Sequence, residues 1–99
     1  MATMSTLHAE PELPKADLRL VAAHASELRD LAAQHGITGL CFASPGRLVG
    51  HVADDRDALD VSEFELGAAE LLGAEALLYS DAVLDKPNVS PDLVSAEPL

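Results

Sequence analysis

The feature that most constrains the fold of this chain is a helical apolar repeat that stops at a glycine and passes directly into a β-favouring run. Apolar side chains recur at helical spacing between Asp17 and His35, and Gly36 follows at once. Glycine is common just beyond the last turn of a helix. Residues 37–43 then favour a strand and carry no helix start signal. The sequence therefore predicts a helix over residues 17–35 that is joined directly to a strand over residues 37–43.

The remaining elements are predicted from caps and periodicity. Ser62 and Glu65 have the spacing of a capping box, and the apolar run that follows stops at Gly73. A short helical turn is expected after residue 43, with Ser44 as its N-cap and Pro45 as its first residue. Strands are expected over residues 58–61 and 75–79. The order helix, strand, strand, helix, strand predicts a small α+β domain.

The domain is expected to span residues 17–85. Residues 1–16 contain prolines and scattered charges without periodicity, so we predict a flexible leader outside the fold. Residues 86–99 are predicted to be a C-terminal tail because three prolines interrupt them. The apolar residues of this tail either pack on the domain or extend onto a partner.

Size and charge limit the kinds of function. The chain has 99 residues, enough for one domain, and only 3% of them are aromatic, so its core must be built from aliphatic side chains. The formal net charge of −11 repels nucleic-acid phosphates and anionic lipids, whereas it favours a basic protein partner. A lone cysteine, no signal peptide and no membrane-spanning run together predict a cytoplasmic protein.

Four residues are candidates for nucleotide chemistry. A turn capped by Ser44 would leave backbone N–H groups free for an anion, and Arg47 lies within it, so this pair is predicted to bind phosphate. Asp55 and Asp57 alternate, and a strand would place both carboxylates on one face to bind Mg²⁺. Phosphate binding combined with paired carboxylates is the minimum for metal-assisted nucleotidyl transfer from ATP.

This order of elements resembles the minimal nucleotidyltransferases (MNT) of the polymerase-beta superfamily, including the antitoxins that pair with HEPN toxins. The resemblance covers residues 31–84 and rests on the segments LAAQHGITGLCFASPGRL, DDRDALDV and AAELLGAEALLYSDAVL. It implies a nucleotidyltransferase-like fold. It also implies that Ser44 and Arg47 bind phosphate and that Asp55 and Asp57 bind metal.

Three departures from the family pattern imply a degenerate catalytic site. Ala43 stands where the family has a glycine that approaches the triphosphate, and Leu77 stands where it has a third carboxylate. Arg56 stands between the paired aspartates, where the family has an apolar residue. The expected function is therefore that of an inactive nucleotidyltransferase-like protein, an antitoxin or regulatory subunit that binds a basic partner such as a cognate toxin.

Alternatives remain open at the level of sequence. An active Mg²⁺-dependent enzyme that adenylates a partner protein is the second hypothesis, and a small dimerising module without nucleotide chemistry is the third. Asp54, Asp55 and Asp57 are more typical of a solvated acidic loop, and Ser44 of a structural cap, whereas Arg47 is equally typical of a surface ion pair. The four histidines lack metal-ligand spacing, so no zinc site is expected. Whether the chain forms homo-oligomers is also left open.

Overall fold

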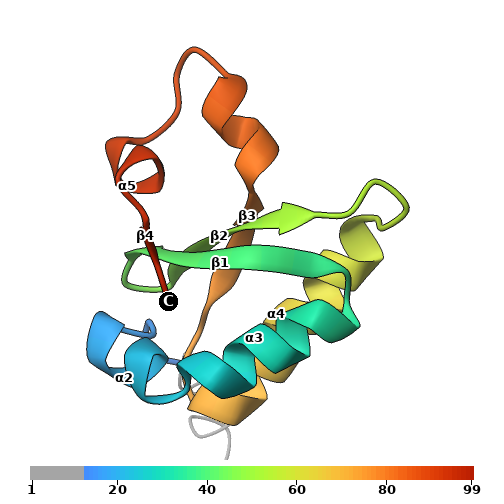
Figure 1. The fold of residues 1–99 in the computed structure, drawn as a ribbon. Helices are drawn as coiled ribbons and strands as arrows, with labels where there is room; N and C mark the ends of the chain where they lie inside the picture. The colour runs from blue at the N-terminus through green and yellow to red at the C-terminus, as the bar shows by residue number, and fades with distance from the viewer. Residues whose placement is uncertain (1–12) are drawn as a thin grey trace, which may run out of the picture.

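A four-stranded mixed sheet organises the chain, and helices lie on both of its sides (Figure 1). The computed structural model describes residues 13–99; the expectation of a flexible leader falls mostly on residues 1–12, outside the described part. The strand order is β3-β2-β1-β4, with β1 antiparallel to both β2 and β4, and β2 parallel to β3. The predicted α+β class is confirmed.

The described elements follow one another in a simple order. They are α2 (Leu18–Ala23), α3 (Ala25–Gln34), β1 (Ile37–Ser44), β2 (Arg47–Val52), α4 (Ala58–Leu72), β3 (Leu77–Ser80), the 3-10 helix η1 (Asp81–Asp85), α5 (Pro91–Val94) and β4 (Glu97–Pro98).

The first helix forms where its apolar period predicts, but in two pieces. Asp17 caps α2, its side chain accepting from the backbone N–H of Leu20, and His24 separates α2 from α3. Val21 and Leu28 are fully buried. The stop at Gly36 is confirmed, because α3 ends at Gln34 and Gly36 has a φ of 71°.

The predicted helical turn after residue 43 is wrong, because residues 44–47 form the tight end of a β-hairpin. Ser44 pairs with Arg47 across the two-residue turn, and Gly46 adopts a φ of 80°. Pro followed by a left-handed Gly is the pattern of a type II turn. A right-handed helical turn cannot contain that φ, so the chain reverses and Arg47 begins β2 instead.

The predicted strand over residues 58–61 is also wrong, because these residues form the first turn of α4. Asp57 and Asp60 form a reciprocal capping box, which places the N-cap of α4 five residues before the expected one at Ser62. Val61 and Phe64 then lie on the same face as Ala68. Phe64 is fully buried, so packing on α3 and the sheet decides the helical state of this segment.

The core lies between the sheet and the three longer helices. In Figure 1, α2, α3 and α4 lie on one side of the strands, whereas η1 and α5 lie on the other. The buried side chains are almost all aliphatic, as the composition predicts. They include Val21, Leu28, Ala32, Ile37, Leu40, Leu48, Phe64, Ala68, Leu72, Ala74, Ala76 and Leu78.

Both ends of the described chain join this domain. Ala16 is buried and its backbone bonds to Glu75 and Gly46, so the domain begins before the expected residue 17. The C-terminal tail packs on the domain, the first of the two alternatives considered: β4 pairs with β1, and Leu93 of α5 is buried. Across residues 13–99, no helix has the length and apolar character needed to cross a membrane.

Candidate functional site

Ser44 and Arg47, the predicted phosphate ligands, lie together at the hairpin end of the sheet, where both contact Asp92 of α5. Ser44 Oγ donates to Asp92 Oδ2 at 2.6 Å, and Arg47 Nη1 lies 3.2 Å from the same oxygen. The Arg47 guanidinium also lies over the Tyr79 ring, 4.8 Å from its centroid. The polar groups expected to hold phosphate therefore hold α5 on the sheet.

The charge of Asp92 is stabilised by these contacts. The hydrogen bond from Ser44 is the main cause that lowers the pKa of the Asp92 carboxyl; partial burial opposes it, and the nearby Arg47 charge adds to the lowering. Asp92 is thus a carboxylate at neutral pH. It presents to this surface the negative charge that a phosphate would otherwise bring.

Asp55 and Asp57, the predicted metal ligands, lie near the other end of β2 and on no strand. Asp57 caps α4, its Oδ1 accepting from the backbone N–H groups of Leu59 and Asp60 at 3.0 and 3.3 Å. Asp55 is exposed in the preceding turn and makes no hydrogen bond or ion pair within residues 13–99. The strand β2, which rises about 16 Å over its six residues, lies between Arg47 and the aspartates, so the structure does not bring the four predicted residues together.

Comparison of this chain with protein-family models, with curated proteins and with solved structures finds no match. The resemblance to minimal nucleotidyltransferases therefore stays a prediction.

A concave surface lies between α4 and β3. Its volume is about 710 Å³. Leu66 of α4 is 68% exposed on its wall, and Leu59, two turns earlier on the same helix face, is 65% exposed. We call this surface the α4–β3 groove; its lining residues are Leu13, Ser62, Glu65, Leu66, Ala69, Glu75, Ala76 and Leu77.

A side chain of α4 contacts the sheet edge beside the α4–β3 groove. β3 is an edge strand, and Leu78 is one of its residues whose N–H points away from β2. That N–H donates to Glu65 Oε2 at 2.7 Å. A charged side chain on an edge hinders pairing with another strand, so Glu65 reduces the capacity of β3 to accept a further strand at Leu78.

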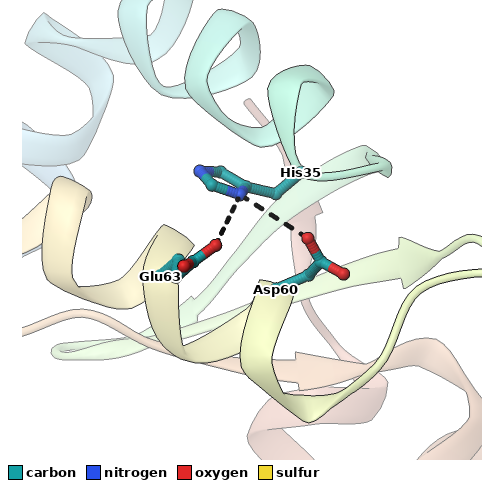
Figure 2. Close-up of side chains that lie close together, drawn as sticks. All are labelled: His35, Asp60 and Glu63. Atoms are coloured by element: carbon teal, nitrogen blue, oxygen red, sulfur yellow. Dashed lines mark ion pairs between the residues drawn. The ribbon is translucent and has the colours of Figure 1, made fainter.

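A second cluster joins the end of α3 to the start of α4. Figure 2 shows the His35 ring facing two carboxylates; His35 Nδ1 lies 3.9 Å from Asp60 Oδ1 and 3.8 Å from Glu63 Oε1. The three donor atoms lie within 4.8 Å of one another. Burial raises the pKa of the Asp60 carboxyl, but the hydrogen bond from the Asp57 backbone and the contact with Arg56 outweigh it, and the net pKa is lowered.

The sequence prediction missed this cluster for a structural reason. His35 lies twenty-five residues before Asp60, and no local spacing connects them. The spacing of Asp60 and Glu63 is i, i+3, which places two side chains together on a helix. With residues 58–61 assigned to a strand, that signal was lost.

Proposed function

We propose that this chain is a non-catalytic protein that binds a basic partner through the α4–β3 groove, in the manner expected of a nucleotidyltransferase-like antitoxin or regulatory subunit. The observation that carries the proposal is the exposure of Leu59 and Leu66 on one face of α4 beside a groove. Exposed apolar side chains beside a groove rimmed by polar residues are typical of protein interaction sites.

Charge selects the class of partner. Helix α4 carries four carboxylates, Asp60, Glu63, Glu65 and Glu70, and no basic residue. Glu65 and Glu75 line the groove itself. Complementary potentials accelerate association and exclude partners of the wrong charge. The partner is therefore a protein that places an apolar side chain against Leu66 and surrounds it with lysine or arginine.

The contacts of the predicted catalytic residues support a non-catalytic role. Ser44 and Arg47 already contact Asp92. The carboxylate of Asp57 already caps α4. A nucleotide phosphate would have to displace an internal carboxylate to reach the first pair. In the enzyme hypothesis, Asp55 would have to bind Mg²⁺ together with Asp57, whose carboxylate already caps α4.

The first experiment mixes the purified chain with the purified product of the adjacent gene and measures the complex by size-exclusion chromatography and calorimetry. We expect a stable complex that Leu66→Asp abolishes, because buried anchors at the centre of an interface dominate binding. The matched control is Val94→Asp: Val94 is 62% exposed but lies on α5, away from the groove. This control is expected to bind like the wild type.

Three outcomes would contradict the proposal. The first is no complex, or a complex equally weakened by Leu66→Asp and Val94→Asp. The second is a homodimer of the chain alone that Leu66→Asp dissociates, because it assigns the groove to a second copy. The third is saturable Mg²⁺-dependent ATP binding that Asp55→Asn abolishes, because it restores the enzyme hypothesis.

A further inference from the structure

We propose that His35, Asp60 and Glu63 bind one divalent transition-metal ion of the Zn²⁺ class, which links the end of α3 to the start of α4. This site is separate from the α4–β3 groove. It also differs from the predicted Mg²⁺ ligands, since neither Asp55 nor Asp57 belongs to it.

The spacing of the donor atoms suits an ion better than it suits direct bonds. Separations of 3.8 and 3.9 Å from His35 Nδ1 are too long for hydrogen bonds. Among the described residues, the His35 ring makes no hydrogen bond, although two acceptors face it (Figure 2). Two ligands held about 2.1 Å from a shared Zn²⁺ in tetrahedral geometry lie about 3.4 Å apart. A contraction of about half an ångström therefore brings His35 into ligand geometry with each carboxylate.

The side chains have the freedom that this contraction requires. The side chain of Glu63 is 53% exposed and has no other ion pair or hydrogen bond within residues 13–99, so it can rotate toward the ion. His35 and Asp60 are 20% and 21% exposed, and each lies on a capped helix end. Two ligands are thus held in place and the third is adjustable.

The donor set determines the class of metal. An imidazole nitrogen suits Zn²⁺, which also accepts carboxylate oxygens as ligands, whereas Mg²⁺ and Ca²⁺ prefer oxygen ligands alone. Three protein ligands leave a further coordination position open to water. Asp60 and Glu63 contribute two negative charges, which neutralise a divalent ion.

Arg56 competes for one ligand. Its Nη1 lies 3.2 Å from Asp60 Oδ1, the same oxygen that faces His35. The two groups are four residues apart on an exposed surface, and pairs of this kind contribute little stability. A divalent ion at His35 therefore displaces Arg56 at small cost.

Two other histidines provide matched controls. His24 Nδ1 lies 2.7 Å from Glu27, and His51 Nδ1 lies 3.2 Å from Asp81. Each is paired with a single carboxylate, so each offers a pair of ligands where His35 offers a set of three. The comparison separates a specific site from general metal binding by surface histidines.

The test is a titration of the full chain with Zn²⁺ against a chromophoric chelator, with thermal unfolding as a second measurement. We expect one Zn²⁺ per chain and a rise in Tm with Zn²⁺, because an ion that binds only the folded state stabilises it. His35→Gln and Glu63→Gln should each weaken binding at least about tenfold and remove the Tm shift. His24→Gln and His51→Gln should leave both unchanged.

Two results would overturn the proposal. One is Zn²⁺ binding or a Tm shift that survives in both His35→Gln and Glu63→Gln, because the ion then lies elsewhere. The other is complete competition by millimolar Mg²⁺, since it identifies a cluster of carboxylates that uses no imidazole. Asp60→Asn is unsuitable for this test because Asp60 also belongs to the capping box of α4.

Discussion

The two polar clusters at opposite ends of the sheet contain similar residues in different states. At the hairpin end, Ser44, Arg47 and Asp92 are joined at 2.6 and 3.2 Å. At the α3–α4 end, His35 lies 3.8 and 3.9 Å from its two carboxylates. In the first cluster Ser44 Oγ and Arg47 Nη1 share one Asp92 oxygen, although Arg47 Nε is buried without a hydrogen-bond partner; in the second, a ring nitrogen faces two acceptors beyond hydrogen-bond distance. Polar residue types alone do not distinguish the two clusters; the distances at which the fold holds the side chains do.

The largest expected effect comes from loosening α5, which places Asp92 beside Ser44 and Arg47. Leu93→Ala removes a buried side chain and is expected to cost about 2–4 kcal/mol in the free energy of unfolding. Urea denaturation followed by circular dichroism measures it. Val94→Ala is the control, since Val94 is exposed and its truncation should change stability little. Equal effects of the two variants would show that α5 is not anchored through Leu93.

A smaller effect separates the two clusters directly. Ser44→Ala deletes the short bond to Asp92 and should lower the free energy of unfolding by about 1 kcal/mol. Without metal, His35→Gln should change it by less than about 0.5 kcal/mol, because no hydrogen bond is lost. Both variants are compared by denaturant titration in the presence of a chelator. A greater loss of unfolding free energy in His35→Gln than in Ser44→Ala would contradict the contrast drawn between the two clusters.

The smallest effect is a difference in acid sensitivity. Because the folded pKa of Asp92 is lowered, its contribution to stability is present above the ordinary carboxyl pKa of 3.8 and is lost as pH falls through the lower folded value. Asp92→Asn removes this contribution at all pH values. The wild type should therefore lose more stability than Asp92→Asn between pH 5 and strongly acidic pH. Unfolding midpoints measured across this range test the prediction, and parallel curves would contradict it.

The predictions that succeeded rest on local signals. The apolar period over residues 17–35, the stop at Gly36 and the strand from Ile37 depend on neighbours within a few residues, and the structure contains all three. The α+β class follows from them. The failures are the turn at residues 44–47 and the start of α4. Ser44-Pro45 and Ser62 each fit a helix start, but Gly46 at positive φ and the Asp57–Asp60 box are stronger determinants there.

The sequence by itself determined an acidic α+β chain with an aliphatic core, because charge, composition and apolar periodicity are properties of residues and their neighbours. Only the tertiary structure decided which polar groups meet. Ser44 and Asp92 are forty-eight residues apart, and His35 and Glu63 are twenty-eight apart. Their distances depend on how α5 and α4 pack on the sheet. Burial of Leu93 and Phe64 sets that packing. The packing brings Asp92 within hydrogen-bond distance of Ser44 and leaves His35 beyond that distance from Asp60 and Glu63.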